Sequence, residues 1–452
     1  MTGVSAADNG HAADGARRAA RRALLRNVLI VFLVALAVRW AADVVLQPHL
    51  GDYVIDSYDV MGQNILDGHG FSYQAGKTIP TVTRAPFYPL WWAAQLAVVG
   101  RHFLLLRMGE GLVDAVTAAL VVFMTAALCR LPWRRGPPAG DKPGSAESGA
   151  FSPLRIATIT GLLYAIQPFT VYYAAKMGTE TWFTFWLVVF IWAFAVWVMA
   201  PGYGRGAVMG VVLGILVLNK STAIGLLVVL GVIALIWLRG RRALAALSLV
   251  VCVVVTGLLV TPWLIRDYEV TDGHFVAVQT LTWWNFWADF DFSPGGYRHT
   301  VENHYGPGGG HPYSLTALAD VQQEARLQGQ ALTWMRTHPG AMLHKMANNL
   351  AEFWYLVEGT RRAQVTGAAM ALELLLAAVG AWLAWRRGRH RLLLMTVVVI
   401  LYFDVVYTPI KSVFHYSLVV VPFLCLLQAF VVAWVVWRVR RRPEAGEPAA
   451  GS

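Results

Sequence analysis

The run Asn27-Val-Leu-Ile-Val-Phe-Leu-Val-Ala-Leu-Ala-Val-Arg-Trp-Ala-Ala-Asp-Val-Val-Leu46 decides the fold, because it is apolar over almost its whole length. At a rise of about 1.5 Å per residue, a helix of about 20 residues covers about 30 Å, the thickness of the hydrocarbon core of a bilayer. Arg17-Arg18-Ala-Ala-Arg21-Arg22 precedes the run, and no convincing small-residue cleavage site follows it. We therefore predict a retained first membrane span, preceded by a basic cytoplasmic tail at 1–26.

The composition of the chain agrees with a membrane protein. Of its 452 residues, 57% are hydrophobic and only 14% are charged, whereas soluble proteins have about 25% charged residues. The net charge of +11 comes from arginines in short runs beside apolar segments, so it indicates orientation in a bilayer and not nucleic-acid binding. Cys129, Cys252 and Cys425 lie in or at the end of apolar runs and predict neither disulfides nor a metal cluster. We predict an all-α polytopic membrane protein.

The topology follows from the rule that basic loops stay in the cytoplasm. The most basic loop, 131–154, must be reached from a first outer loop at 47–86 by an odd number of crossings, yet two apolar runs lie between them. The run 87–105 contains Pro89, so we predict that it is an interfacial or re-entrant helix on the outer face. The predicted spans are then about 27–46, 109–129, 155–174, 180–199, 206–219, 222–238, 243–262, 367–385, 391–410 and 417–437.

These about 10 spans divide the chain into regions. Residues 27–262 form a transmembrane catalytic module, and residues 263–366 form an extracytoplasmic loop region with amphipathic helical patterning near its end. Residues 367–437 form the C-terminal transmembrane helices, and 438–452 form a second cytoplasmic tail. Both termini are therefore expected in the cytoplasm.

Several ionisable residues fall inside predicted spans, and three of them lie at a similar depth. Arg39, Asp114 and Asp404 each lie about 9–10 Å below the outer surface when the helical rise is applied. Such groups either tie helices together or face a wet cavity. Their shared depth favours a polar cavity that opens outward.

Two outer segments carry the residues that define a family resemblance. Gly51-Asp-Tyr-Val-Ile-Asp-Ser-Tyr-Asp59 supplies three carboxylates, and Arg84-Ala-Pro-Phe-Tyr-Pro-Leu-Trp-Trp92 follows after Asn64-Ile-Leu-Asp-Gly-His-Gly-Phe-Ser72. This order resembles the first periplasmic loop of C-type (GT-C fold) glycosyltransferases. It is most similar to the family 39 branch, which includes protein O-mannosyltransferases and bacterial lipid A aminoarabinose transferases.

Further pieces resemble the family in the same order along most of the chain. They are Thr179-Glu-Thr-Trp-Phe183, Leu218-Asn-Lys-Ser-Thr222, Thr261-Pro-Trp-Leu-Ile-Arg-Asp267, Trp284-Asn285, Thr337-His-Pro339 and His415-Tyr-Ser-Leu-Val-Val-Val-Pro422. The resemblance implies a GT-C-like bundle and an inverting transfer of a sugar from a polyprenyl-phosphate donor. The acceptor would be a lipid, glycan or protein on the extracytoplasmic face of the plasma (inner) membrane.

The resemblance also implies that an aspartate of the first loop is the catalytic base. Asp56 is favoured because it lies closest to Tyr58, which resembles the family tyrosine. The usual aspartate would precede that tyrosine by four residues, where Val54 stands, so Asp52 is a serious alternative. Glu180 resembles the second acid of the family. A solvated loop charge or a helix-terminal carboxylate is the competing interpretation for each of them.

The chemistry also needs cations, because the lipid phosphate leaves with growing negative charge. Arg84, Lys220 and Arg266 are candidates, although each could instead reach toward lipid headgroups. The family commonly has Arg-Tyr at the last span, where this chain has His415-Tyr416. Phosphate contact there would depend on histidine protonation or on the nearby Lys411.

A cofactor is not firmly implied. His299, His304 and His311 match no ligand spacing well, so a divalent metal is unsupported. Trp283, Trp284 and Trp287 could stack on a sugar, but belts of tryptophan at span ends are the simpler explanation.

Two other functional classes stay open. A transporter or flippase for a lipid-linked sugar would also explain the spans, but it often shows internal repeats and charges near the midplane. A noncatalytic assembly subunit with the same fold is the other class.

Overall fold

The chain folds into a helical bundle. The computed structural model describes residues 5–52, 54, 57–131, 149–288, 316–357 and 359–440, and every regular element in them is helical. Seven helices are long and apolar enough to cross a membrane, or eight if a bent pair counts as one span. These findings confirm the predicted all-α, multi-pass class. The long helices are α1 (Ser5–Leu50), α4 (Phe103–Leu128), α8 (Thr179–Met199), α11 (Arg242–Val270), α16 (Thr360–Arg386), α17 (His390–Tyr407) and α18 (Val421–Arg440), which follows the 3-10 segment η5 (Phe414–Val420).

The bent pair consists of α6 (Pro153–Ala165) and α7 (Pro168–Ala175), which meet at 49°. Pro168 causes the break, because proline cannot donate the backbone hydrogen bond that would continue α6. The Gln167 side chain accepts a hydrogen bond from the N–H of Thr170 and caps the new helix. The predicted span at 155–174 is therefore a broken helix.

Two short apolar helices, α9 (Tyr203–Asn219) and α10 (Ile224–Trp237), match the predicted hairpin. Helix α9 packs closely on α11 through glycines spaced four residues apart. A Cβ at Gly206 would lie 2.3 Å from the carbonyl oxygen of Ser248, and one at Gly210 would lie 2.6 Å from that of Cys252. Small residues at this spacing allow two membrane helices to approach at backbone distance.

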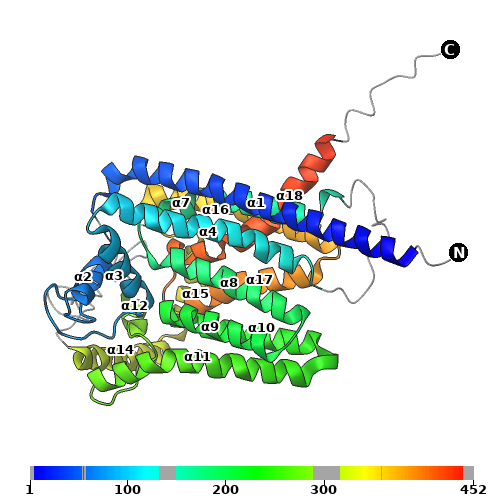
Figure 1. Cartoon of the computed structure of the whole chain (residues 1–452). Helices are drawn as coiled ribbons and strands as arrows, with labels where there is room; N and C mark the ends of the chain where they lie inside the picture. The colour runs from blue at the N-terminus through cyan, green and yellow to red at the C-terminus, as the bar shows by residue number, and fades with distance from the viewer. Residues whose placement is uncertain are drawn as a thin grey trace, which may run out of the picture.

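The helices α2 (Tyr58–Leu66), α3 (Phe87–Val99), α12 (Thr282–Ala288) and α14 (Ala317–Thr337) gather at one end of the bundle, which we call the α2/α3 end (left in Figure 1). The N-terminal part of α1 and the C-terminal part of α18 lie at the other end. Helix α3 occupies the first part of the run 87–105, whose last residues begin α4, and its 13 residues are too few to cross a hydrocarbon core of about 30 Å. Gly100, at φ 64°, ends it. The interfacial position of α3 stays a prediction.

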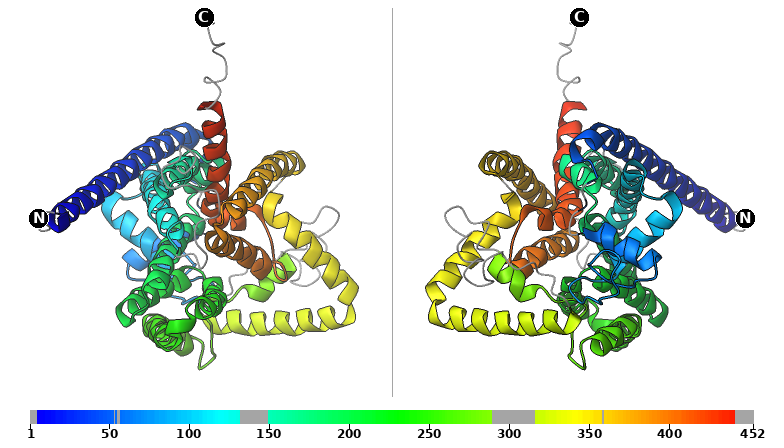
Figure 2. Two further views of the ribbon diagram at one scale, coloured as in Figure 1. Left: turned by 90° about the vertical axis from the view of Figure 1, so that its right-hand side faces the viewer. Right: turned by 90° about the vertical axis from the view of Figure 1, so that its left-hand side faces the viewer.

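Helix α15 (Pro339–Tyr355) follows α14, and the two meet at a sharp corner to one side of the bundle (yellow in Figure 2). The usual arrangement of a surface helix is inverted in α15. Its polar side chains Lys345, Asn349 and Glu352 are buried, whereas Leu343 is 68% exposed and Leu350 is 43% exposed. Exposed leucines over a buried polar face fit an apolar surrounding better than water.

Two of the ionisable residues in spans form a buried ion pair. Arg39 of α1 and Asp114 of α4 lie 2.6 Å apart, and both side chains are almost wholly buried. The hydroxyl of Tyr164, on α6, donates a 2.5 Å hydrogen bond to Asp114, and Arg39 donates one of 2.7 Å to the carbonyl of Ala165. The pair therefore ties α1, α4 and α6 together. Asp404 accepts a hydrogen bond from Trp354, which links α17 to α15.

Candidate functional site

The centre of the candidate site is an ion pair between Glu180 and Lys220. Glu180 stands in the first turn of α8, where the helix dipole favours a carboxylate. Lys220 occupies the extended residue between α9 and the 3-10 turn η2 (Ser221–Ala223). The Lys220 Nζ lies 2.7 Å from Glu180 Oε1, and both side chains are largely buried. The two helix ends are thus joined by a charge-assisted hydrogen bond.

His415 and Tyr416, on η5, complete this group. The Lys220 Nζ lies 5.2 Å from the centre of the Tyr416 ring, within the range of a cation–π contact. The Tyr416 ring stacks on Tyr407 at 4.4 Å, which fixes its plane. His415 is near enough to Glu180 to interact with it electrostatically. We call Glu180, Lys220, His415 and Tyr416 the Glu180 cluster.

Arg84 and Tyr58 form a second group at the same end of the bundle. Arg84 Nε donates a 2.8 Å hydrogen bond to the Tyr73 hydroxyl, and its guanidinium carbon lies 5.8 Å from the Tyr58 ring centre. Tyr58 in turn meets Tyr88 edge-on at 4.9 Å. The structure therefore brings together the tyrosine and the arginine of the two first-loop motifs.

Aromatic contacts connect the two groups. Trp182, two residues after Glu180, meets Trp91 at 4.8 Å and Phe87 at 5.2 Å. Both partners belong to α3, which begins just after Arg84. The start of α8 is therefore packed against the helix that follows the Arg84 motif.

Of the three first-loop acids, the structure describes Asp52 and Asp59. Asp56 lies outside the described residues. Asp52 is exposed in the turn after α1 and interacts electrostatically with Arg107. Asp59, on α2, forms an exposed ion pair with Arg101 at 3.2 Å. Ser57 adopts a left-handed conformation at φ 54°, which is uncommon for a residue other than glycine and often marks a functional site.

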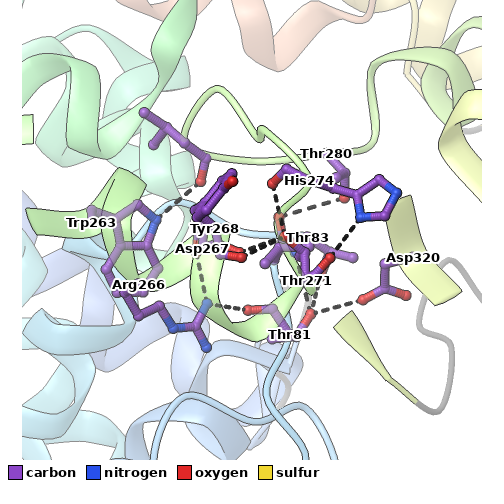
Figure 3. A network of polar contacts seen from close by, with 12 residues as sticks. Thr81, Thr83, Trp263, Arg266, Asp267, Tyr268, Thr271, His274, Thr280 and Asp320 are labelled. Carbon is purple, nitrogen blue, oxygen red and sulfur yellow. Dashed lines mark hydrogen bonds and ion pairs between the residues drawn. The ribbon is translucent and has the colours of Figure 1, made fainter. Parts of the chain in front are cut away.

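Arg266 has a different set of neighbours from the other predicted cations. Its NH1 group donates hydrogen bonds of 2.7 Å to the carbonyl of Thr81 and 2.8 Å to Asp267 (Figure 3). Its guanidinium carbon lies 4.8 Å from the Trp263 ring centre and 5.3 Å from that of Phe71. The structure thus places it against the first loop.

Two basic residues with prominent contacts were not predicted from the sequence as site residues. Lys176, at the end of α7, lies with its Nζ 5.3 Å from the Tyr173 ring centre, and that ring lies 6.2 Å from His415. Arg107, buried at the start of α4, donates hydrogen bonds to Gln47 and to the carbonyls of Gly51 and Ala175. Each is a single basic residue near a span end, where headgroup contact is the default interpretation.

The tryptophans near 283–287 belong to a separate hydrophobic cluster of α12 and α14. Trp287 is buried and donates a hydrogen bond to the carbonyl of Leu327. Glu324 accepts hydrogen bonds from the N–H groups of Trp283 and Trp284, and burial raises the pKa of this carboxyl above its usual value. Lys411 lies 5.8 Å from the Trp284 ring centre. Sugar stacking at these rings stays a prediction.

No group of three or more His, Cys, Asp or Glu side chains is placed to hold a metal ion in the part of the chain that the structure describes. His299, His304 and His311 lie outside those residues.

The chain is similar to solved structures, although not to a known sequence family. No family model and no curated protein matches the sequence. Among solved structures, the chain is similar to ArnT from Cupriavidus metallidurans in the apo state. The match has a TM-score of 0.37 and 15% sequence identity, and it covers 90% of this chain and 77% of ArnT.

Proposed function

We propose that this protein is an integral membrane glycosyltransferase of the C-type fold. It transfers a sugar from a polyprenyl-phosphate donor to a lipid, glycan or protein acceptor. We place the reaction at the α2/α3 end, which the positive-inside rule puts on the extracytoplasmic face.

The observation that carries the proposal is the Glu180 cluster. Its members come from three sequence motifs far apart in the chain, and the fold brings them into one group around a 2.7 Å ion pair. The cluster lies where spans end, so the headgroup of a membrane-held lipid could reach it. A lysine beside a histidine and a tyrosine suits the phosphate of such a donor, a diester that gains negative charge as the sugar leaves and is then stabilised by charge-assisted hydrogen bonds.

The reaction needs a base and cations on the two sides of the anomeric carbon. A carboxylate takes the proton of the acceptor hydroxyl, whose oxygen then bonds to the anomeric carbon. The bond from that carbon to the phosphate oxygen breaks, and polyprenyl phosphate leaves. The configuration at the anomeric carbon is inverted. We assign the base to Asp56, with Asp52 as the alternative and Glu180 as the second acid. Lys220, Arg84, His415 and Tyr416 hold the leaving phosphate, and Tyr58 positions Arg84.

A reconstituted assay tests the proposal. The purified protein in liposomes would be given labelled polyprenyl-phosphate sugars, and the label would be followed into lipid, glycan or protein acceptors. Lys220→Met should lower kcat/KM for the donor by about 10- to 100-fold, the loss expected for one charge-assisted contact. Lys77→Met, which neutralises an exposed first-loop lysine, is the matched control and should leave transfer unchanged.

The first-loop acids need their own variants. Asp56→Asn and Asp52→Asn should identify the base, because only the residue that takes the proton should abolish transfer. Normal transfer by both variants would refute a first-loop base. The same liposomes distinguish a flippase, which would move the labelled donor across the bilayer with its sugar still attached.

A further inference from the structure

Arg266 fixes one edge of the first loop. Its NH1 group donates to the carbonyl of Thr81, and its guanidinium carbon lies 4.8 Å from the Trp263 ring centre and 5.3 Å from that of Phe71. The two rings also meet each other, edge-on at 4.8 Å. One side chain of α11 therefore contacts the segment 71–85 both at its first residue, Phe71, and toward its end, at Thr81.

Two other elements hold the same segment. The N–H of Thr280 donates a 2.9 Å hydrogen bond to the carbonyl of Val82, and the Gln279 side chain accepts one of 3.3 Å from the N–H of Ala85. Asp320, on α14, accepts a 3.4 Å hydrogen bond from the Thr81 hydroxyl, which is also bonded to Thr83 (Figure 3). The segment is thus held from α11, from residues 279–280 and from α14.

The burial of this segment is unusual for a loop. Val82 and Thr83 are almost completely buried, although connecting segments normally run over the surface. Val278 and Leu281 on the opposing segment have φ values of 75° and 83°, which cost conformational energy for residues with a Cβ. Strain of this kind persists only where the surrounding contacts fix the backbone.

The held segment leads directly to Arg84. Arg84 follows Thr83 in the chain, and its Nε is bonded to Tyr73 at the beginning of the same segment. The position of the Arg84 guanidinium is therefore set by the contacts that fix residues 71–83. Arg266 makes the contact that an ammonium group could reproduce least well, because a planar guanidinium can face aromatic rings while its N–H groups donate in the plane of the guanidinium.

We propose that Arg266 is a positioning residue, which fixes the segment 71–85 so that Arg84 meets the donor phosphate. The inference rests on the proposed function. Arg84 and the Glu180 cluster then contact the donor phosphate, whereas Arg266 does not. Direct contact between Arg266 and the donor is the competing outcome of the test.

A double-mutant cycle separates the two roles. Arg84→Met and Arg266→Met should each lower kcat/KM for the donor by about 10-fold or more. If Arg266 acts through Arg84, the double variant should be no worse than Arg84→Met alone. Two losses that multiply would overturn the inference, because independent phosphate contacts behave in that way. Arg266→Lys keeps the charge and should lose as much activity as Arg266→Met, whereas substantial rescue by lysine would also overturn it.

A labelling experiment tests the contact without using activity. A cysteine at the buried Thr83 should react slowly with a membrane-impermeant maleimide and much faster when Arg266→Met is added. A cysteine at the exposed Lys77 should react equally in both backgrounds. Trp263→Phe is a milder change, which removes the hydrogen bond to the Val278 carbonyl. It should raise the labelling rate of Thr83→Cys to an intermediate value, and it replaces Arg266→Met in the test if that variant folds poorly. Unchanged labelling would overturn the inference, whereas faster labelling without transfer of any sugar would refute only the proposed function.

Discussion

The ion pair of Glu180 and Lys220 allows a quantitative prediction. At 2.7 Å and an effective dielectric constant of about 20, the attraction between two unit charges is about 6 kcal/mol. The loss of water around both groups offsets much of this, because both side chains are largely buried. Removing one partner of such a pair typically costs about 3–5 kcal/mol. We therefore expect Glu180→Gln and Lys220→Met each to lower the free energy of unfolding by that amount.

The double variant is the decisive measurement. Glu180→Gln with Lys220→Met should lose clearly less stability than the sum of the two single losses, because it leaves neither charge without the other. The free energies of unfolding would be measured for all four proteins in the same detergent. Losses that add to within about 0.5 kcal/mol would refute the reasoning, since that is the behaviour of independent sites.

The same variants separate two roles for Glu180 in catalysis. If Glu180 only holds Lys220, Glu180→Gln frees the ammonium for the donor phosphate, and KM for the donor should fall while kcat changes little. If Glu180 accepts the proton of the acceptor, kcat should collapse with little change in KM. Lys220→Met should raise KM or lower kcat in either case, so it confirms that the assay reports on the cluster.

Four further outcomes are expected, each measured as a thermal midpoint or by labelling. Gly210→Ala should destabilise the protein by about 1–3 kcal/mol, because its Cβ would lie 2.6 Å from a carbonyl oxygen of α11, whereas Gly204→Ala, with open space around it, should not. Asp114→Ala should cost about 3–5 kcal/mol by leaving a buried arginine without its carboxylate. A cysteine at Leu343 should be protected from water-soluble maleimides in liposomes and exposed after detergent extraction if this face of α15 lies in lipid. Burial raises the pKa of Glu324 above its ordinary value of 4.5. The stability that its protonated form contributes is therefore fully present below pH 4.5 and is lost as the pH rises through the folded pKa. The thermal midpoint of Glu324→Gln should accordingly rise relative to that of the parent protein from acid to neutral pH.

Much of the fold could be predicted from the sequence because the bilayer imposes length and hydropathy on each span. The predicted spans fall on α1, α4, α8, α11, α16, α17 and α18, on the bent pair and on the short hairpin. The bend before Pro168 could not be placed, because an apolar run shows the length of a crossing but not where its hydrogen bonds are broken. The inverted polarity of α15 also escaped, since amphipathic spacing does not tell which face is turned to the protein.

The candidate site was predicted in part. Glu180, Lys220, His415 and Tyr416 were chosen from separate motifs, and the structure places them together. Arg39 and Asp114 were expected to face a cavity, but they are partners across two helices, which depth in the membrane alone cannot reveal. Arg266 shows the same difficulty: an arginine at the outer end of a span suggests a phosphate ligand until its actual neighbours, a carbonyl, a carboxylate and two aromatic rings, are known.

The backbone conformation indicates that shared contacts hold both groups of the candidate site, the Glu180 cluster and the group of Arg84 and Tyr58. Ser57 and Met177 both adopt left-handed conformations, at φ 54° and 56°, and each precedes a predicted site residue by no more than three positions. Met177 is fully buried and belongs to the same hydrophobic cluster as Tyr58. Packing in that cluster must therefore stabilise both strained turns, since each costs of order 1–3 kcal/mol alone. It follows that the first loop and the start of α8 are held in position by one shared set of apolar contacts, so that a core substitution there should disturb Tyr58 and Glu180 together.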